Sequence, residues 1–286
     1  MSLSPREALA LSHCASVATP LGQLHYRQAG AAAQATHVLL HGIGSAADSW
    51  AYQLAAAAGR EELRVLAWDA PGYGQSTHLQ VAEPLAEDYA RQVWAWLDAL
   101  GQHDPVVLVG HSLGALMAAS ATRLAPARVR QLVLLAPARG YGDAPPAERA
   151  QVLHKRLDNL RQLGPQGMAQ ARASAMLAPG ADPQRVEAVR EAMAQVDPAG
   201  YTQAAHMLVQ GRLQADVNLL STDLTVASGE LDGITPAAAC AEVARVAGRS
   251  WVSLGPVGHA CPLEAPDAVN TLLGLPPLST PTKVQA

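Results

Sequence analysis

The chain has little of several features that would point to a particular class of protein. Charged residues make up 15% of its 286 residues, and the net charge is −4 with no basic run. This balance argues against nucleic acid and against an anionic membrane surface as partners. No apolar stretch approaches the roughly 18 residues that a membrane-spanning helix needs. Phenylalanine is absent and alanine is abundant, which we attribute to the base composition of the coding DNA rather than to function.

Cysteine is also scarce, with only Cys14, Cys240 and Cys261. Because three is an odd number and the spacing fits no metal or redox motif, the sequence predicts a cytoplasmic protein with ordinary, mostly buried thiols. Residues 11–14 (Leu-Ser-His-Cys) superficially resemble a lipoprotein cleavage site, but the apolar run before them is short and has no positive flank. No His, Cys, Asp or Glu cluster has metal-ligand spacing and no Gly-rich nucleotide loop occurs, so we expect neither metal nor cofactor.

Apolar residues, in contrast, make up 49% of the chain, enough for a substantial core in one large domain or two small ones. Strand-like and helix-like runs alternate through most of the sequence, a pattern typical of a parallel sheet wrapped by helices. Residues 17–28, divided at Gly22, predict an opening antiparallel hairpin. The patterns predict further strands at residues 36–40, 64–69, 105–109, 129–136, 224–228 and 250–254, and helices at 88–97 and 113–123.

The most informative segment is residues 110–114 (Gly-His-Ser-Leu-Gly), which directly follow a buried apolar run and precede a helical pattern. A serine at such a strand-to-helix bend forms a nucleophile elbow, in which a strained backbone pushes the hydroxyl out above the sheet. Gly110 and Gly114 are required because a Cβ at either position would collide with the neighbouring strand or helix. The segment therefore predicts that Ser112 is a nucleophile.

Further motifs fall at the ends of predicted strands. Residues 41–44 (His-Gly-Ile-Gly) follow the predicted strand at 36–40, residues 229–232 end in Asp232, and residues 255–259 end in His259. Together with the turn sequence at 69–76 (Asp-Ala-Pro-Gly-Tyr-Gly-Gln-Ser) and the chain order Ser, Asp, His, these motifs make the chain resemble the α/β-hydrolase superfamily over nearly its whole length.

The resemblance implies an α/β-hydrolase fold, with a mostly parallel central sheet flanked by helices and an inserted helical cap. Its parts are a first core segment at 1–136, a cap at 137–216 and a second core segment at 217–275. The composition of residues 276–286 predicts a flexible tail. The cap region is rich in Ala, Arg and Gln, shows no strong strand and is followed at once by renewed core strands. A linker or an independent domain is the alternative interpretation of this stretch.

The resemblance also assigns the chemistry. Ser112 needs a base to become nucleophilic, and His259 would take its proton and return it to the leaving group. Asp232 would hold the imidazole in one tautomer and stabilise its charged form. Glu230 and Asp143 are rivals for the role of the acid, Glu230 because it is close in sequence and Asp143 because it follows the preceding strand.

The oxyanion formed during attack needs two backbone N–H groups, for which we predict those of Ile43 and Leu113. His41 and His111 are interpreted as packing and hydrogen-bonding residues rather than proton carriers. The turn at residues 69–74 is expected to support the active-site face.

Substrate contacts are expected from Arg139 and Tyr141, which follow the strand before the cap, and from His206 and Met207 inside it. Arg139 is a candidate for binding a substrate carboxylate through bidentate hydrogen bonds, and a solvated surface arginine is the alternative.

We therefore expect a cofactor-free Ser-His-Asp hydrolase that cleaves a small carboxylic ester or lactone through an acyl-serine intermediate. The chain is similar to the enol-lactone hydrolases and to the meta-cleavage product hydrolases, which cleave a C–C bond with the same triad. A perhydrolase or haloperoxidase, and a binding protein that has lost catalysis, are further alternatives. Serine at position 112 excludes the haloalkane dehalogenase and epoxide hydrolase relatives, which place Asp there. A small molecule is the expected partner, and a homodimer is left open.

Overall fold

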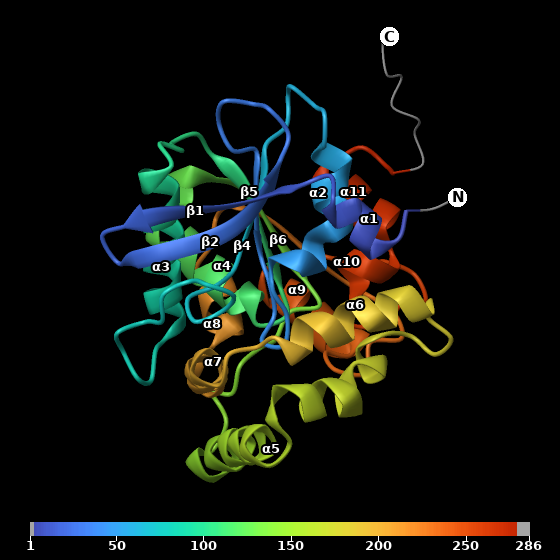
Figure 1. Ribbon diagram of the computed structural model, residues 1–286. Helices are drawn as coiled ribbons and strands as arrows, with labels where there is room; N and C mark the ends of the chain where they lie inside the picture. Colours follow the sequence, from blue (N-terminus) through green and yellow to red (C-terminus); the bar gives the residue numbers. More distant parts are fainter. Residues whose placement is uncertain (1–2, 279–286) are drawn as a thin grey trace.

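The protein, as seen in a computed structural model that describes residues 3–278, is built on one eight-stranded sheet (Figure 1). Its strands are β1 (His13–Thr19), β2 (Gly22–Ala29), β3 (His37–Leu40), β4 (Val65–Trp68), β5 (Val106–His111), β6 (Val129–Leu135), β7 (Asp223–Ser228) and β8 (Trp251–Ser253). Their spatial order is β1-β2-β4-β3-β5-β6-β7-β8. The pairs β1/β2 and β2/β4 are antiparallel and the others are parallel, as in the predicted fold.

Helices connect and cover these strands. They are α1 (Pro5–Leu9), η1 (Ala47–Trp50), α2 (Ala51–Ala57), α3 (Ala86–Ala99), α4 (Gly114–Leu124), η2 (Pro126–Arg128), α5 (Pro146–Arg172), η3 (Ser174–Met176), α6 (Pro183–Ala194), α7 (Pro198–Gln210), α8 (Leu213–Asn218), α9 (Ala237–Val246), α10 (Cys261–Glu264) and α11 (Pro266–Leu273). The sequence also predicted the opening hairpin, although β1 begins at His13, four residues earlier than the sequence pattern indicated.

The central strands are mostly apolar because both faces of the sheet are covered. In β5, Val106 and Leu108 point to the cluster that packs against α3, α4 and α9, whereas Val107 and Val109 point to the cluster on α2 and α11. Successive side chains of a strand alternate between faces, so one unbroken apolar run supplies both cores.

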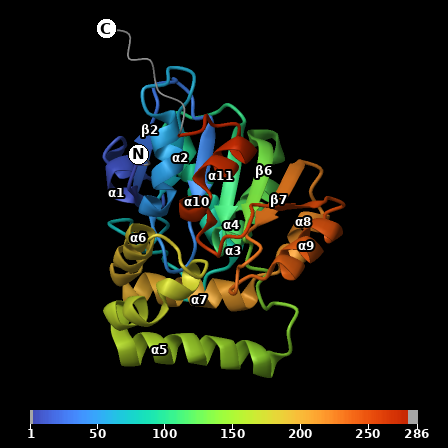
Figure 2. The ribbon, with the colours of Figure 1, turned by 90° about the vertical axis from the view of Figure 1, so that its right-hand side faces the viewer.

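Between β6 and β7 the chain is helical (Figure 2). Helix α5 is broken at Gly164, where φ is 62°, and packs against α6 and α7. Figure 2 shows α7 between α5 and the strands. Helix α8 crosses the expected boundary at residue 216 and packs against α4 and α9 of the core, so the layer away from the sheet consists of α5–α7.

Two expectations from composition need correction. Cys14 is exposed on β1, because the hairpin there forms the edge of the sheet, whereas Cys240 and Cys261 are buried. The expected flexible tail begins too early: the Leu278 N–H donates to Asp267 Oδ1 at 2.8 Å, and Asn270 donates to the Pro276 carbonyl, so residues 276–278 follow α11 closely. Residues 279–286 of that tail lie outside the described residues.

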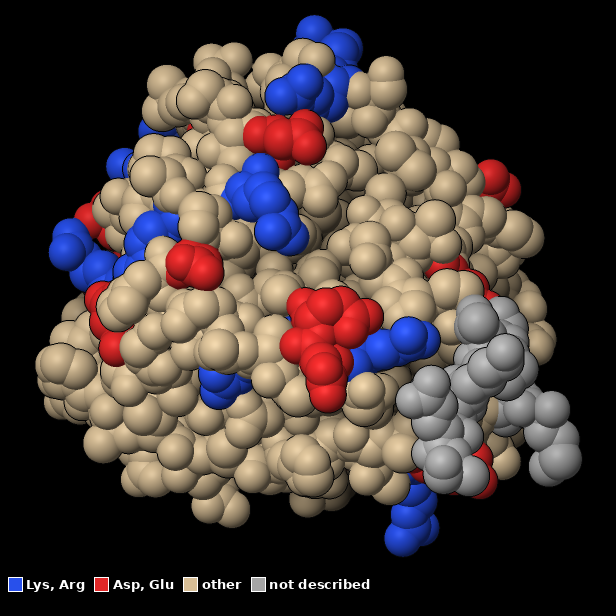
Figure 3. All heavy atoms as spheres, turned by 90° about the horizontal axis from the view of Figure 1, so that it is seen from above, with Lys and Arg blue, Asp and Glu red and all other residues tan. Residues whose placement is uncertain are grey.

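The face opposite α5–α7 is seen in Figure 3. Lys and Arg side chains lie there among Asp and Glu side chains, and most of the visible surface belongs to other residues. The mixed signs on this face agree with the near balance of 20 basic and 24 acidic residues in the sequence.

Candidate active site

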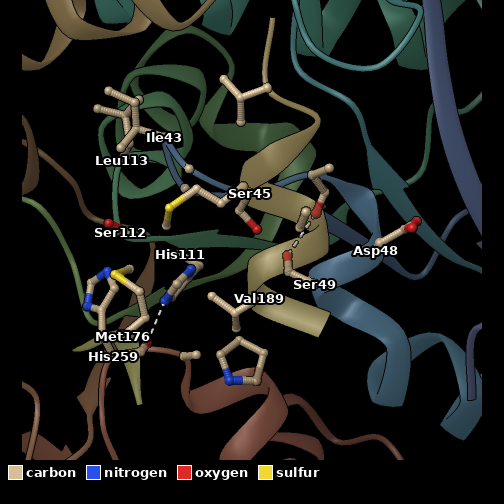
Figure 4. A pocket seen from close by; sticks show the side chains of 18 of the residues that line it. Ile43, Ser45, Asp48, Ser49, His111, Ser112, Leu113, Met176, Val189 and His259 are labelled. Atoms are coloured by element: carbon tan, nitrogen blue, oxygen red, sulfur yellow. Dashed lines mark hydrogen bonds between the residues drawn. The ribbon is translucent and has the colours of Figure 1, made fainter. Parts of the chain in front are cut away.

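The carboxyl ends of the parallel strands meet at one edge of the sheet, which is where open α/β sheets hold their ligands. The turn after β3, Ser112 after β5 and the loops after β7 and β8 therefore come together although they are far apart in sequence. Figure 4 shows Ser112 between the Ile43 and Leu113 side chains on one side and His259 on the other.

Ser112 occupies the bend between β5 and α4 with a left-handed backbone, φ being 53°. A Cβ added to Gly110 would overlap the Gly114 backbone, and one added to Gly114 would overlap the carbonyl group of Leu40. The predicted requirement for glycine at both positions is confirmed. The tight approach of α4 to β3 and β5 forces residue 112 into a conformation that L-amino acids avoid.

His259 lies beside Asp232, with Nδ1 2.8 Å from Asp232 Oδ2. Both side chains are withdrawn from water, His259 being 1% and Asp232 4% exposed. Since an ionised carboxylate only accepts, Nδ1 carries the proton and donates it to Asp232. Nε2 of His259 therefore holds the lone pair, and His259 lines the same pocket as Ser112.

Asp232 is held by more than the histidine. Its Oδ1 accepts from the backbone N–H groups of Ile234 (2.7 Å) and Thr235 (2.9 Å), and its Oδ2 lies 2.8 Å from Thr235 Oγ1. Burial acts to raise the pKa of Asp232, but the hydrogen bond and charge of His259 and the donors of Thr235 outweigh it, so the pKa lies below its usual range. The carboxylate is thus ionised and fixed in orientation.

The two rival acids have other partners. Glu230 accepts a hydrogen bond from Ser253 Oγ at 2.6 Å, and Asp143 forms an exposed ion pair with Arg212. Within the described residues neither contacts His259, whose carboxylate partner is Asp232.

His111 connects the elbow to the histidine loop. Its Nε2–H donates to the carbonyl oxygen of His259 at 2.8 Å, drawn as a dashed line in Figure 4. Burial, reinforced by the charge of His259, lowers the pKa of His111 to about 3, so its ring is neutral. The residue before Ser112 thereby sets the position of the His259 backbone. No hydrogen bond joins Ser112 Oγ to His259 in the part of the chain that the structure describes.

The backbone N–H groups of Ile43 and Leu113 have no acceptor among the described residues, and both residues line the pocket. Buried N–H groups are nearly always paired, so two unpaired donors beside Ser112 are available to a ligand.

His41 sets the direction of one of these donors. Its Nε2 accepts from the Ala70 N–H at 3.0 Å, so its Nδ1 carries the proton and donates to the Gly42 carbonyl at 2.8 Å. The Gly42 carbonyl and the Ile43 N–H are opposite ends of one planar peptide, so holding the carbonyl aims the N–H the other way. Burial lowers the pKa of His41 to about 4, which keeps this arrangement neutral.

The turn after β4 supports the same peptide segment. The Tyr73 hydroxyl donates to the carbonyl of Ile43 at 2.8 Å, and the Tyr73 ring lies edge-on to His41 with centroids 4.8 Å apart. Residues 69–74 were expected to support the active-site face, and Ala70 and Tyr73 do hydrogen-bond to the turn after β3 that lines the pocket. The sequence did not single out Tyr73 for this contact, because only the fold places it against the β3 turn.

The pocket around Ser112 has a volume of about 1650 Å³, larger than the roughly 300–1,000 Å³ of most small-molecule sites. Helices α5–α7 supply part of its wall, including Met176 from the short η3 turn between them and Met193 from α6. Arg139 and Tyr141 line it as expected; Arg139 is exposed and has no acidic partner within 4.0 Å among the described residues.

The expectation for His206 and Met207 was wrong, because neither lines the pocket. Helix α7 turns Tyr201 and Leu208 toward it, and these two lie seven residues apart on one face. Met207, which is fully buried, faces the core instead. His206 Nδ1 lies 3.9 Å from Glu83 Oε2 in the neighbouring loop. Neither helical periodicity nor composition revealed which face of α7 points inward.

Among residues 3–278 no group of three or more His, Cys, Asp or Glu side chains is arranged to hold a metal ion. Nor does any helix in that range combine the length and apolar character that crossing a membrane requires.

The sequence model of the Alpha/beta hydrolase family matches residues 38–272, most of the chain. The chain belongs to this family. The alpha/beta hydrolase resembles "2-hydroxy-6-oxononadienedioate/2-hydroxy-6-oxononatrienedioate hydrolase 1" of Dechloromonas aromatica (strain RCB), with 35% identity over 118 residues that cover 40% of this chain and 39% of that protein. The matched segments span less than two thirds of the length of the curated relatives.

Solved structures of similar fold cover nearly the whole chain. A hydrolase from Pseudomonas aeruginosa PA01 matches with a TM-score of 0.78 and 26% identity over 92% of this chain and 98% of that one. The enol-lactonase from Burkholderia xenovorans LB400 matches with a TM-score of 0.79 and 23% identity over 91% of this chain and 98% of that one. With 23% sequence identity, the match to the enol-lactonase shows that the two proteins share a fold.

Proposed function

We propose that the protein is a serine hydrolase that cleaves a small carboxylic ester or lactone through an acyl-Ser112 intermediate. The observation that carries the proposal is the buried His259–Asp232 pair, whose geometry leaves the Nε2 lone pair of His259 in the pocket that Ser112 lines. A base oriented by a carboxylate, in the same pocket as a serine at a strand-to-helix elbow, is the arrangement that acyl transfer requires.

In the proposed reaction Ser112 Oγ attacks the carbonyl carbon while its proton passes to His259 Nε2. The N–H groups of Ile43 and Leu113 bind the resulting oxyanion, and ionised Asp232 stabilises the imidazolium. Collapse of the intermediate expels the alcohol, which takes the proton from His259. A water molecule then attacks the acyl-enzyme, with the same groups handling its proton, and releases the acid and Ser112.

We further propose that helices α5–α7 act as a cap. Figure 2 shows them as a layer below the strands, where α6 contributes Met193 and α7 contributes Tyr201 to the pocket wall, and the η3 turn between α5 and α6 contributes Met176. Covering the pocket excludes water, which strengthens the electrostatic interactions around the developing oxyanion.

A second candidate is cleavage of a C–C bond in a meta-cleavage product, and the similarity to the 2-hydroxy-6-oxononadienedioate hydrolase supports it. The short His-Gly-Ile-Gly turn at residues 41–44 argues against it, because C–C hydrolases usually carry a longer Gly/Pro-rich oxyanion sequence. A binding protein without catalysis would leave every substrate intact, so turnover distinguishes it from both enzymes.

The test is hydrolysis of 4-nitrophenyl esters, from acetate to octanoate, by the wild type and by Ser112→Ala. We expect turnover by the wild type and a kcat lower by roughly 10⁴- to 10⁶-fold in the variant, which loses the nucleophile but keeps the fold. A folded Ser112→Ala protein with the wild-type rate would refute the serine mechanism.

Asp232→Asn and Glu230→Gln form a matched pair for the same assay. The first should lower kcat by about 10⁴-fold because it favours the wrong imidazole tautomer. The second removes the negative charge of Glu230, two residues before Asp232. The Glu230 carboxylate accepts a hydrogen bond from Ser253 and not from His259, so kcat should stay within about twofold of the wild type.

A further inference from the structure

One partly buried arginine in the pocket wall has no acidic partner in the part of the chain that the structure describes. Arg156 projects from α5, is half-buried and lines the pocket. Its only side-chain hydrogen bond joins Nη1 to the Tyr201 hydroxyl at 3.4 Å, and no carboxylate lies within 4.0 Å among the described residues. A guanidinium has five N–H donors, so most of them are left for a ligand.

The other arginines of the pocket differ from Arg156 in one respect or the other. Arg27 pairs with Asp48. Arg6, Arg139 and Arg172 are exposed, so water solvates them. Arg156 alone among these described pocket residues is both partly withdrawn from water and without an acid. A partly buried guanidinium without an acidic partner has lost some of its contacts with water. Binding an anion would replace those contacts.

Contacts place Arg156 on the oxyanion side of the pocket. Tyr201, its partner, lies in the first turn of α7, and the preceding residue, Gly200, packs directly on the backbone of Gly72. Tyr73, the residue after Gly72, donates a hydrogen bond from its hydroxyl to the Ile43 carbonyl. Burial raises the pKa of the Tyr73 hydroxyl, and the charge of Arg156 acts against this rise, which agrees with their proximity.

We propose that Arg156 binds a carboxylate of the substrate, so that the natural substrate is an ester or lactone that carries an anionic carboxylate apart from the bond that is cleaved. The proposal rests on the hydrolase function proposed above and adds the substrate class. The planar guanidinium matches a carboxylate with two parallel hydrogen bonds, which binds the substrate and fixes its direction in the pocket. Binding energy of this kind positions the carbonyl and takes no part in proton transfer.

The experiment compares neutral 4-nitrophenyl butyrate with two anionic esters: mono-4-nitrophenyl glutarate, which carries the carboxylate in the acyl part, and 4-acetoxybenzoate, which carries it in the leaving part. For Arg156→Gln we expect kcat/KM to fall roughly 10- to 100-fold on at least one anionic ester, mainly through KM. The neutral ester should change by no more than about twofold. Arg156→Lys keeps the positive charge but cannot form the two parallel hydrogen bonds of a guanidinium. Its kcat/KM on the anionic ester should therefore lie between those of the wild type and Arg156→Gln.

Arg161→Gln is the matched control, because Arg161 lies on the same helix but is exposed and pairs with Asp158. It should leave all three esters unaffected. An equal loss on neutral and anionic esters in Arg156→Gln would overturn the proposal, as would selective loss of the anionic esters in Arg139→Gln instead.

A binding measurement separates this proposal from the proposed function. Glutarate dianion should raise the melting temperature of the wild type and of Ser112→Ala, and this shift should be lost in Arg156→Gln. If no ester is hydrolysed but this pattern holds, the carboxylate site stands and the hydrolase function fails. If Arg156→Gln retains the shift, or the wild type shows none, the carboxylate site is refuted whatever the esterase result.

Discussion

At the scale of single residues, Ser112, the proposed nucleophile, has a strained backbone that lowers the stability of the fold. Its left-handed backbone, with φ of 53°, results from the close approach of α4 to β3 and β5 through Gly110 and Gly114. The strain persists because the surrounding strand and helix determine the bend, and it presents the hydroxyl to the pocket. Replacing the residue therefore affects activity and stability separately.

We expect Ser112→Gly to be more stable than Ser112→Ala by about 1 kcal/mol, because only glycine adopts a left-handed backbone without a Cβ penalty. Both variants lack the hydroxyl, so neither should hydrolyse esters if the proposed function holds. Urea denaturation of the two proteins measures the difference. Equal stabilities would show that position 112 stores no backbone strain.

At the scale of elements, helix α7 is the contact between the helices over the pocket and the core. Gly200 in its first turn touches the Gly72 backbone, Asp197 pairs with His78 at 2.7 Å, and Gln203 donates to the carbonyl of Leu79 at 2.8 Å. These contacts hold α7 on the turn that supports the Ile43 peptide, the proposed oxyanion donor. The position of α7 and the geometry of the pocket around Ser112 are thus linked.

A Cβ at residue 200 would overlap the Gly72 backbone, so Gly200→Ala should push α7 away. We expect a loss of about 2 kcal/mol in the free energy of unfolding, together with a higher KM for esters as the pocket wall moves. Urea denaturation and ester kinetics measure the two effects. Ala199→Ser alters the exposed neighbouring residue and should change neither. If the two variants behave alike, the contact at Gly200 does not hold α7 in place.

At the scale of the whole molecule, buried neutral histidines make stability depend on pH. Burial lowers the pKa of His41 to about 4 and that of His111 to about 3, and it also lowers the pKa of His37. In the unfolded chain a histidine has a pKa of about 6.5. Below that pH the unfolded state binds protons that the folded state excludes, so the free energy of unfolding decreases as pH falls. Burial raises the pKa of Asp69 and Glu264, which acts in the opposite direction.

The variant His111→Gln measures how much His111 contributes to the pH dependence of the free energy of unfolding. Between pH 7 and pH 5 the free energy of unfolding of His111→Gln should fall by about 2 kcal/mol less than that of the wild type, because the variant lacks the histidine that binds a proton in the unfolded chain only. Urea denaturation at the two pH values measures this slope. His103→Gln, at an exposed site, should keep the wild-type slope. An unchanged slope in His111→Gln would mean that His111 titrates normally in the folded protein.

The sequence by itself determined the sheet, the elbow at Ser112 and the late histidine loop, because these depend on local patterns. Apolar runs define strands covered on both faces, and glycine occurs where a Cβ at residues 110 and 114 would overlap backbone. Pattern and turn chemistry act over a few residues, so they can be recognised without knowledge of the packing.

Only the tertiary structure decided which side chains meet. It paired His259 with Asp232 rather than Glu230 or Asp143 and turned Met207 of α7 into the core. It also left Arg156 in the pocket wall without an acidic partner among residues 3–278. The physical reason is that hydrogen bonds and ion pairs act over about 3 Å, a distance set by how elements remote in sequence pack together. Neither the periodicity of a helix nor the spacing of a motif contains that distance.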